Sequence, residues 1–375
     1  MVSTDWNLTE ALDRAATVAE EHAIEVDRTG SFPRRSIEAL AETGLLGLIS
    51  STEVGGRGEG LRAAATVIER LARSCASTAM VTLMHYCGTA VVEAYGPRRV
   101  REEIAAGRHL TTLAFSEAGS RSQFWTPLST ATRAGEEVRL NARKSWVTSA
   151  GEADSYIWSS RPLEAEGLST IWLVPAGAPG LALTGGFDGL GMRGNASRPI
   201  TATEVTLPPS AMLGPDGGGL EIMMGTVLPW FQVLNAASSL GIAEAAVART
   251  VAHASATRLE HLGQTLADQP MTRAHLARMR MLVDQARGLF LDTLAAIESQ
   301  REDASLRVLE VKPVASEAAV ATTDLAMRVC GGAAFRKEVG VERNFRDARA
   351  ATVMAPTTDA LHEFIGRAVC GLPVF

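Results

Sequence analysis

Three carboxylates in the sequence, Glu117, Asp188 and Glu221, could act as general bases in an enzyme. A positioned carboxylate is one of the groups that proteins use to remove a proton from a substrate. Each of the three also fits a solvated residue or a helix cap, which is the commoner role. His85 lies on an apolar helical stretch, where it would either contact a substrate or be a core histidine with satisfied ring nitrogens.

The segment Arg121-Ser-Gln-Phe-Trp125 combines a cation, a hydroxyl, an amide and two aromatic rings. An arginine can hold a carboxylate or thioester oxygen through two parallel hydrogen bonds. We therefore expect Arg121 and Ser122, as candidate catalytic residues, to face a substrate. A simple surface loop accounts for the same residues equally well.

The four cysteines do not form a metal or redox motif. Cys75, Cys87, Cys330 and Cys370 are widely spaced, lie in apolar surroundings and have no histidine at ligand spacing. Buried free thiols are the expected state of such residues. We predict no metal site.

The elements that position these side chains fall into three consecutive regions, which have helical, β-rich and again helical sequence patterns. Residues 8–108 have helical periodicity, with apolar residues at spacings of three and four through residues 11–26, 36–45 and 62–75. Residues 110–208 consist of short β-rich runs separated by Gly, Pro and Asp. Their expected strands are residues 111–115, 137–141, 144–148, 155–159, 169–174 and 200–205.

Long alanine-rich helices return after residue 220. The pattern predicts helices over residues 220–251, 272–299, 307–330 and 359–370, separated by short Gly or Pro breaks. Four such helices favour a bundle. We predict an N-terminal α-helical domain (residues 1–109), a middle β domain (residues 110–214) and a C-terminal helical bundle (residues 215–375).

The charge and hydropathy of the chain exclude some classes of partner. A net charge of −6 across 375 residues gives no basic field for a phosphodiester backbone, so we expect no nucleic acid. The longest apolar run, around residues 79–94, is interrupted by His85 and Glu93 and is too short for a membrane span. The polar start is unlike a secretory signal, and we expect a cytoplasmic protein without membrane contact.

Several motifs, in order along nearly the whole chain, resemble those of acyl-CoA dehydrogenases. The most specific is Asn141-Ala-Arg-Lys-Ser-Trp-Val-Thr148, which is similar to the family's Asn-Gly-x-Lys-x-Trp-Ile-Thr strand. Leu113-Ala-Phe-Ser-Glu-Ala-Gly-Ser120 resembles the family's flavin-adjacent segment, with Arg121 in place of an aspartate. Further matching segments are residues 40–56, 189–194, 203–208, 327–332 and 342–349. The resemblance implies an α+β multidomain fold: an N-terminal α-helical domain, a middle β-barrel or sheet domain and a C-terminal four-helix bundle.

The resemblance also implies that the cofactor is FAD. By analogy with the family, Trp146 lies against the isoalloxazine ring and the Thr148 hydroxyl hydrogen-bonds flavin N5. A flat aromatic wall excludes water, and a hydroxyl at N5 tunes the atom that exchanges hydride. The other cofactor-binding residues implied by the matching motifs are Phe115, Ser116, Ser120, Arg258, Arg328, Gly331, Gly332, Thr357 and Asp359.

The carboxylate that the family uses to remove the substrate α-proton is missing from both of its usual positions. Ala355 occupies one and Phe231 the other, with Gln232 where an arginine is common. By this register His85, Gln232 and Ala355 line the substrate site. A general base is worth about 10²- to 10⁴-fold in rate, so a conventional desaturase without one would be slow.

Three functions remain open at this point. The first is a flavin-dependent oxygenase or oxidase acting on a CoA thioester or a metabolite derived from one. Its chemistry would come from the reaction of reduced flavin with O₂, so it would not need the carboxylate base. The second is an acyl-CoA dehydrogenase, performing α,β-desaturation, with a displaced base. The third is a non-catalytic flavin- or CoA-binding protein, against which the retained Trp146 and Thr148 argue. The resemblance further implies an acyl-CoA ester as substrate, a flavin reductase or an electron-transfer flavoprotein as partner, and a homodimer or homotetramer.

Overall fold

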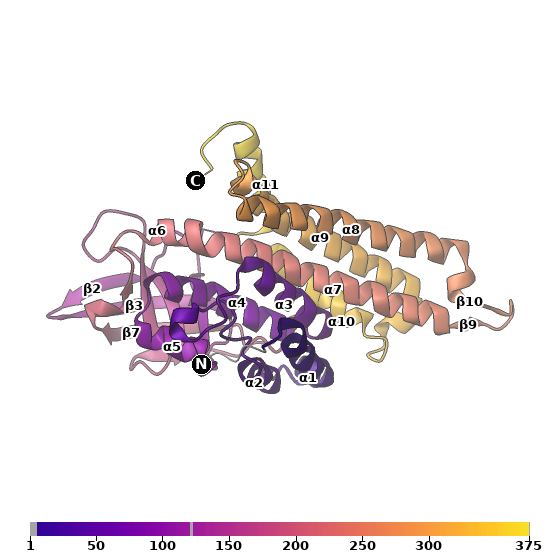
Figure 1. Cartoon of the computed structure of the whole chain (residues 1–375), viewed down its shortest axis with the longest axis horizontal. Coiled ribbons are helices and arrows are strands. Elements are labelled where there is room, and N and C mark those ends of the chain that lie inside the picture. The colour runs from indigo at the N-terminus through magenta and orange to yellow at the C-terminus, as the bar shows by residue number, and fades with distance from the viewer. Residues whose placement is uncertain (1–5, 121–122, 375) are drawn as a thin grey trace. The chain divides into compact units, whose positions relative to one another are not determined.

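The computed structural model describes residues 6–120 and 123–374, which divide into two compact units. Unit 1 comprises residues 1–67, 77–189 and 193–231, and unit 2 comprises residues 68–76, 190–192 and 232–375. The mixture of helices and sheets expected from the sequence is confirmed (Figure 1). The three-domain boundaries stay a prediction.

The helices of unit 1 come mainly from the N-terminal part of the chain. They are α1 (Leu8–Thr29), α2 (Arg34–Glu42), η1 (Thr52–Val54), the first half of α3 (Leu61–Ser74), α4 (Ala76–Tyr95), α5 (Arg98–Ala105), η2 (Pro209–Ala211) and α6 (Gly219–Ile222). The Asn7 side chain caps α1 by accepting from the backbone N–H groups of Thr9 and Glu10. Gly30 ends α1 at φ 67°, a conformation that glycine adopts without steric penalty.

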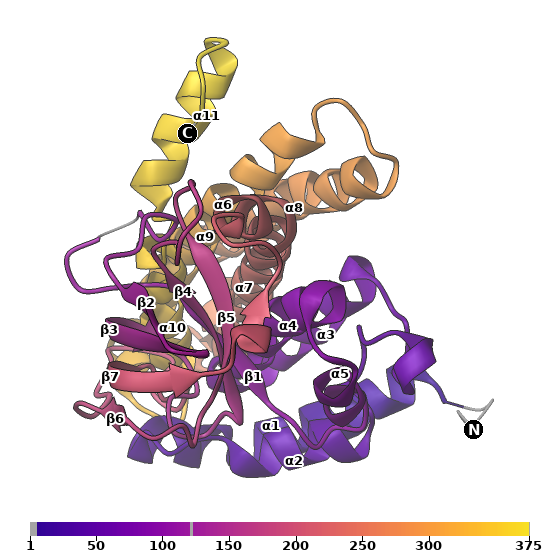
Figure 2. The ribbon, with the colours of Figure 1, turned by 90° about the vertical axis from the view of Figure 1, so that its left-hand side faces the viewer.

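Two four-stranded sheets make up the β part of unit 1 (Figure 2). The first has the order β1 (Thr111–Ala114), β4 (Ser155–Ser160), β5 (Thr170–Pro175) and β8 (Met212–Leu213), with β1 and β4 parallel. The second, fully antiparallel, has the order β2 (Thr130–Ala134), β3 (Glu137–Val147), β7 (Arg198–Leu207) and β6 (Leu181–Leu183).

The two strands expected over residues 137–148 are one strand, β3. Its side chains alternate between buried and solvent-facing, as in a sheet with one covered face. Strands β2, β6 and β8 were not predicted, because each is short and has weak alternation. The chain also contains a π-helix, η3 (Met223–Val227), where α6 runs into α7. It lies just before Pro229, which cannot donate the helical hydrogen bond to the preceding turn.

Unit 2 is built on long helices that lie side by side (Figure 1). It contains most of α7 (Leu228–Ala256), β9 (Arg258–Leu259), β10 (Gln264–Thr265), η4 (Leu266–Asp268), α8 (Pro270–Glu298), α9 (Ala304–Cys330), η5 (Gly331–Phe335), α10 (Val341–Val353) and α11 (Thr358–Val369). A buried cluster joins α7, α8 and α9 through Ala246, Met279 and Leu325. Helix α10 was not among the predicted helices. Its sequence is rich in charged residues, so the apolar residues that pack on α9 do not form a clear helical pattern.

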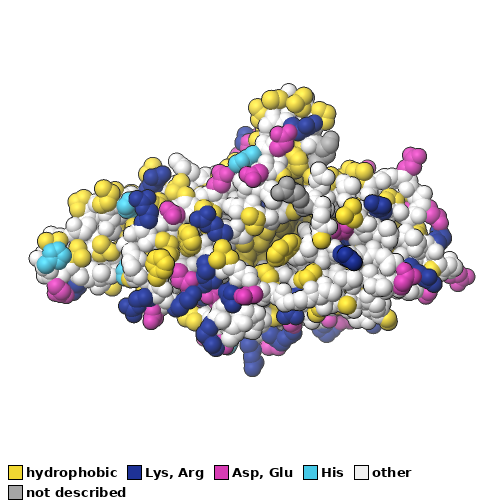
Figure 3. Space-filling view, turned by 180° about the vertical axis from the view of Figure 1, so that it is seen from behind, with side chains coloured by type: hydrophobic (Ala, Val, Ile, Leu, Met, Phe, Trp, Pro, Cys, Tyr) yellow, Lys and Arg dark blue, Asp and Glu magenta, His cyan; other side chains and the backbone are white. Residues whose placement is uncertain are grey.

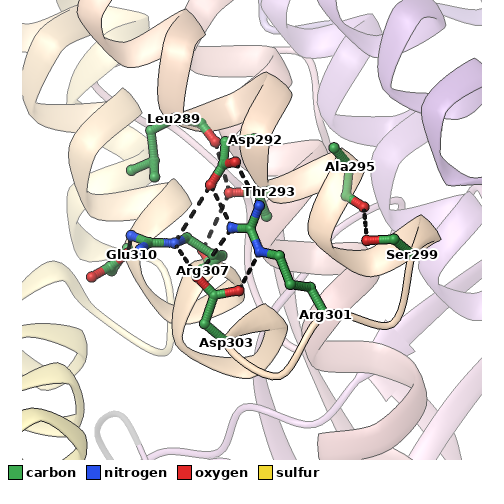
Figure 4. Close-up of polar contacts among 9 residues, drawn as sticks. All are labelled: Leu289, Asp292, Thr293, Ala295, Ser299, Arg301, Asp303, Arg307 and Glu310. Carbon is green, nitrogen blue, oxygen red and sulfur yellow. Dashed lines mark hydrogen bonds and ion pairs between the residues drawn. The ribbon is translucent and has the colours of Figure 1, made fainter.

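The turn between α8 and α9 is closed by a network of ion pairs (Figure 4). Arg301 binds Asp292 at 2.8 Å and also pairs with Asp303, while Arg307 pairs with Asp303 and Glu310. These side chains are partly exposed, so each pair alone contributes little free energy. Together they fix the direction in which α9 leaves the turn.

Close packing of α3 on α7 in unit 2 depends on Gly241. A Cβ at this position would lie 2.3 Å from the Glu69 carbonyl oxygen and 2.7 Å from the Ala72 Cβ. The Glu69 carboxylate is in turn held by Arg287 of α8 at 2.9 Å. Glycine therefore sets the distance at which this ion pair forms.

We expect Gly241→Ala to lower the free energy of unfolding by about 1–3 kcal/mol, because the methyl group overpacks the helix contact. Gly288 provides the matched control, since it is a helical glycine of α8 and a methyl group added to it would meet no atom within 4 Å. Gly288→Ala should stabilise by up to about 1 kcal/mol through helix propensity. Chemical denaturation of the two variants measures both values, and equal effects would show that α3 is not tightly packed.

Candidate active site

Trp146 occupies a strained position in β3 of unit 1. The pairing of β3 with β7 shifts register between Lys144 and Val147, and Trp146 within this bulge has φ 56°. The left-handed region is uncommon for any residue with a bulky side chain. The bulge leaves the Trp146 side chain 70% exposed, although its neighbour Val147 is buried. Strand β3 thus presents a large flat aromatic surface for a ligand.

Thr148, two residues further on, is buried beside a second hydroxyl. Its Oγ1 lies 3.2 Å from the Ser197 Oγ, and either atom can donate. The Ser197 backbone N–H donates to the Asn195 side chain at 3.0 Å, and the Ser149 N–H donates to the Asn195 carbonyl at 2.9 Å. The segment after Gly194 therefore fixes the Thr148 hydroxyl. Ser197 was not predicted from the sequence; its signal is its position three residues after the Gly-Met-Arg-Gly motif.

Glu117 is not a displaced base. Its carboxylate is buried and accepts the Lys144 Nζ at 2.6 Å, the Leu128 N–H at 2.5 Å and the Ser129 N–H at 3.1 Å. Burial alone would raise the pKa of Glu117, but the charge and hydrogen bond of Lys144, with the Ser129 hydroxyl, hold it below its usual value. A carboxylate so paired is ionised but has no free lone pair directed at a substrate. This also corrects the expectation that Glu117 is solvated.

Lys144 completes this buried pair from β3. Its Nζ donates to the Ser159 carbonyl at 2.7 Å and to the Ser159 hydroxyl at 2.9 Å, both on β4. Burial lowers the pKa of Lys144 to about 8, although Glu117 acts in the opposite direction. The pair connects the two sheets of unit 1, two residues before Trp146.

The other two carboxylates have the commoner roles expected of them. Asp188 is largely exposed and pairs with Arg193 at 2.8 Å. Glu221 is exposed in the first turn of α6, where a negative charge is favoured. Neither is held as a base would be.

His85 is a core residue, which corrects the predicted contact with substrate. Its ring is fully buried, with Nε2 3.0 Å from the Leu46 carbonyl and Nδ1 accepting the Thr111 N–H at 3.2 Å. Burial lowers the pKa of His85 to about 4, so the ring is neutral at physiological pH. Both nitrogens are occupied by the backbone, and the histidine joins α4 to β1.

Residues 115–120, predicted to bind the cofactor, are held by one ring contact and by hydrogen bonds. The Phe115 ring is buried and stacked on Phe124 at a centroid distance of 6.4 Å. The Ser116 carbonyl accepts the Ser145 N–H at 2.9 Å, and the Ser120 hydroxyl donates to the Glu117 carbonyl at 3.1 Å. The segment is thereby attached to β3. Arg121 and Ser122, the candidate catalytic residues, lie outside the described residues.

In unit 2, Ala355 lies in a short loop whose backbone accepts hydrogen bonds from Lys312. The Lys312 Nζ donates to the Met354 carbonyl at 2.7 Å and to the Pro356 carbonyl at 2.6 Å, on either side of Ala355. Lys312 comes from the middle of α9 and is fully buried, whereas Ala355 is partly accessible. Sequence reasoning missed Lys312, because a lysine within a helix usually faces solvent.

We expect the contribution of Lys312 to stability to depend on pH. Burial lowers its pKa to about 7, below the ordinary lysine value of 10.5. Between these values the unfolded chain binds one more proton than the folded chain, so the free energy of unfolding rises with pH. Relative to Lys312→Met, the wild type should gain up to roughly 1 kcal/mol per pH unit above pH 7. Denaturant unfolding of both proteins at pH 6, 7, 8 and 9 measures this difference; a constant difference would contradict it.

The predicted cofactor residues of unit 2 fall into two groups. Thr357 caps α11 by accepting the Ala360 N–H, and Asp359 is exposed in its first turn. Arg328, Gly331 and Gly332 are exposed at the far end of α9, and no atom lies within 4 Å of a methyl group built on either glycine. The second group also includes Arg258, exposed after the end of α7, which pairs with Glu260 at 3.8 Å.

The two groups are too far apart to contact the same end of one ligand. Lys312 binds the loop next to Thr357, and Gly331 follows 19 positions later along α9. At 1.5 Å per residue the separation is roughly 28 Å. Unit 2 therefore brings Ala355, Thr357 and Asp359 together but places Arg328, Gly331 and Gly332 elsewhere.

Two of the matched motifs bind one another within unit 2. The Asp347 carboxylate accepts the Met192 N–H at 2.6 Å, and Arg346 donates to the Leu190 carbonyl at 3.0 Å. A Cβ at Gly191 would lie 2.5 Å from the Arg346 carbonyl oxygen. The Arg-Asp-Ala motif is thus a structural anchor for the Gly-Met-Arg motif.

Metal-ligating clusters are not a feature of the described residues. Residues 6–120 and 123–374 contain no group of three or more His, Cys, Asp or Glu side chains able to hold a metal ion. Basic and acidic side chains are interspersed on the face shown in Figure 3. The continuous helical stretch Gly219–Ala256 is long and apolar enough to cross a membrane, but most of it is buried inside the protein, so it is weak support for a span.

The chain runs from helices through sheets to helices, and β3 carries an exposed Trp146 followed by a buried Thr148. The N-terminal, middle and C-terminal domain families of acyl-CoA dehydrogenases match residues 8–107, 112–205 and 217–370. The chain belongs to the acyl-CoA dehydrogenase family.

Relatives of known sequence and structure agree with this assignment. The chain is 29% identical to the mitochondrial short-chain specific acyl-CoA dehydrogenase of Bos taurus, over 90% of this chain and 82% of that protein. It is 28% identical to the cyclohex-1-ene-1-carbonyl-CoA dehydrogenase of Geobacter metallireducens, over 95% of each. The butyryl-CoA dehydrogenase structure from Megasphaera elsdenii superposes with a TM-score of 0.89 at 24% identity, covering 98% of each chain.

FAD is the cofactor of this family, and the described residues fit it. Trp146 offers an exposed flat ring, and Thr148 and Ser197 offer a hydroxyl donor fixed by the backbone. The open surface at Gly331 and Gly332 allows a close approach to the backbone. The chain is therefore a flavin oxidoreductase of this family.

Proposed function

We propose that the protein is an FAD-dependent dehydrogenase of acyl thioesters whose α-proton is not removed by a carboxylate at position 355. The relatives with matching domains are dehydrogenases, which supports α,β-desaturation over the oxygenase predicted first from the sequence. The observation that carries the proposal is Trp146, held exposed at φ 56° two residues before Thr148. A strained, exposed aromatic side chain is retained where a ligand uses it.

Bound FAD would supply the two-electron oxidation, as the acceptor of the hydride that leaves the β-carbon. Trp146 covers one side of the reacting atoms, and Thr148 positions a hydroxyl donor whose orientation Ser197 sets. Ala355 offers no proton acceptor, so the α-proton passes to water. The product is a 2,3-unsaturated thioester, and the electrons leave to an electron-transfer flavoprotein or to O₂.

This mechanism favours substrates whose α-protons are already acidic, because water is a weak base. A CoA ester is the substrate class that the family suggests. The separation of the two predicted cofactor groups in unit 2 supports a homodimer or homotetramer, in which a second chain would supply the distant group. A cytoplasmic location remains part of the proposal.

An oxygenase is the second candidate, and Ala355 is the observation that favours it. A reaction that uses O₂ on a reduced flavin does not require removal of the α-proton by a carboxylate. The two candidates differ in the source of electrons: the dehydrogenase takes them from the acyl substrate, and the oxygenase from an external reductant.

An anaerobic titration of the purified flavoprotein with a panel of acyl-CoA esters distinguishes the two. Bleaching of the oxidised flavin band by an ester alone would support the dehydrogenase. An unchanged band with every ester, together with oxygen uptake and product formation only when a flavin reductase or dithionite is supplied, would support the oxygenase. A purified protein that binds no flavin would overturn both.

A further inference from the structure

Helix α7 carries two buried amide side chains one turn apart, Gln232 and Asn235. Gln232 is 0% exposed and Asn235 is 1% exposed. Neither the oxygen nor the nitrogen of the Gln232 amide has a hydrogen-bond partner among the described residues, and the same holds for the Asn235 oxygen. Positions three apart lie on nearby faces of a helix, so the two side chains leave α7 on the same side.

These unpaired groups are costly in the protein alone. A buried polar group without a partner loses its hydration and gains nothing in return. The neighbouring residues Val233 and Leu234 are fully buried, so this stretch of α7 accommodates apolar side chains. Retention of two amides at such positions therefore calls for a partner that the chain does not supply.

Asn235 lies beside the loop that contains Ala355. The Asn235 Nδ2 is 3.4 Å from the Met354 Sδ, and Lys312 holds the carbonyl groups of Met354 and Pro356. Met354 and Ala355 are partly accessible, so a ligand can reach the loop that contacts Asn235. The site lies within unit 2 and includes the position where the family's base would project.

The chemistry of the site selects a neutral ligand group. A primary amide carries two donors and an acceptor but no charge. A hydroxyl or amide group of a ligand matches it, because each both donates and accepts. A carboxylate would need a counter-charge, and Lys312 already directs donors at two backbone carbonyls.

We propose that Gln232 and Asn235 form a subsite for a neutral hydroxyl or amide group on the acyl chain, next to the carbons that react. This inference rests on the proposed function, since it names the class of acyl thioester that is oxidised. The hydrogen bonds to this group select a polar acyl chain over a plain alkyl chain of equal length.

The test is the binding of matched esters to the flavin-loaded protein. Butyryl-CoA, 3-hydroxybutyryl-CoA, 4-hydroxybutyryl-CoA and succinyl-CoA are titrated anaerobically into the wild type, Gln232→Leu and Asn235→Leu, with dissociation constants from calorimetry. The matched control is Thr322→Val, which removes another buried, unpaired polar group from α9 of unit 2. Bleaching of the flavin is recorded in the same samples.

We expect the wild type to bind one of the hydroxylated esters about 10- to 100-fold more tightly than butyryl-CoA. Gln232→Leu should lose this preference while binding butyryl-CoA at least as well, and it should melt at a higher temperature. Thr322→Val should also melt higher but keep the preference.

The outcomes separate the subsite from the proposed function. Equal binding of all esters by the wild type, a preference for succinyl-CoA, or a preference that survives in Gln232→Leu would overturn the subsite, and would assign the unpaired amides to buried water or to the flavin. A preference lost in Gln232→Leu without flavin bleaching by any ester would support the subsite and overturn the dehydrogenase. Absence of binding by every ester would overturn both.

Discussion

Ala355→Glu should accelerate flavin reduction by an acyl-CoA ester by about 10²- to 10⁴-fold. This is the range by which a positioned general base increases the rate of a proton transfer. The loop can accommodate such a side chain because position 355 is partly accessible. Lys312 also fixes the carbonyl groups of the residues on both sides of it. The measurement is the single-turnover rate of flavin bleaching after anaerobic mixing, at a saturating ester concentration.

Ala355→Gln is the matched control for this gain. Glutamine has nearly the same shape as glutamate but cannot accept the proton, so it should leave the rate close to that of the wild type. The rate of the glutamate variant should also rise with pH through the pKa of the new carboxylate, and the rates of the other two proteins should not. A glutamate variant no faster than the glutamine variant would show that the substrate α-carbon does not approach position 355.

The strand that carries Trp146 and Thr148 could be predicted because its signal is local. Alternating burial along β3 and the order of residue types are both contained in twelve consecutive positions. The bulge at Trp146 could not be predicted, since it depends on how β3 pairs with β7, more than 50 residues later. Ser197 was missed for the same reason: only the fold brings its hydroxyl to Thr148.

Lys312 and Glu117 show the same limit for charged residues. In the sequence each has the surroundings of a solvated residue, and their partners lie 11 to 44 positions away. A charge in an apolar neighbourhood is compatible with a base, a solvated residue or a buried pair, and only the set of contacts distinguishes these. The same holds for His85 on α4. Its two partners, the Leu46 carbonyl and the Thr111 N–H, lie outside α4 and are brought to the ring only by the fold.

The pairing of motifs is a further contribution that sequence similarity could not provide. Residues 189–194 and 342–349 match motifs of the family, but the sequence alone does not show what their side chains do. In the structure, Asp347 and Arg346 use their polar groups on the backbone of Met192 and Leu190. These motifs maintain the shape of unit 2, and the proposed function rests instead on Trp146, Thr148 and the loop at Ala355.

Breaking the Glu117–Lys144 pair from either side should destabilise unit 1 by about 3–5 kcal/mol, because each single change leaves an uncompensated buried charge. Lys144→Met leaves the Glu117 carboxylate without its cation. Glu117→Leu leaves the Lys144 ammonium with only Ser159 of β4 as its partner. The double variant should lose much less than the sum of the single losses, since two apolar side chains can pack where the two ions were. Denaturant unfolding of the four proteins measures this coupling.

The same cycle should depend on pH in a defined direction. Because the folded protein holds the pKa of Glu117 below its ordinary value of 4.5, the unfolded chain binds more protons in acid. The contribution of the pair is therefore fully present between pH 4.5 and about 8, where Lys144 begins to lose its proton, and it is lost in acid as the pH falls through the lowered pKa of Glu117. The coupling energy should shrink in acid, and the single variants should unfold at a milder pH than the double variant, because the pair holds β3 at the edge of the bulge. A coupling energy near zero at pH 7 would show that the two charges are solvated independently, and that the position of Trp146 is maintained by the sheet alone.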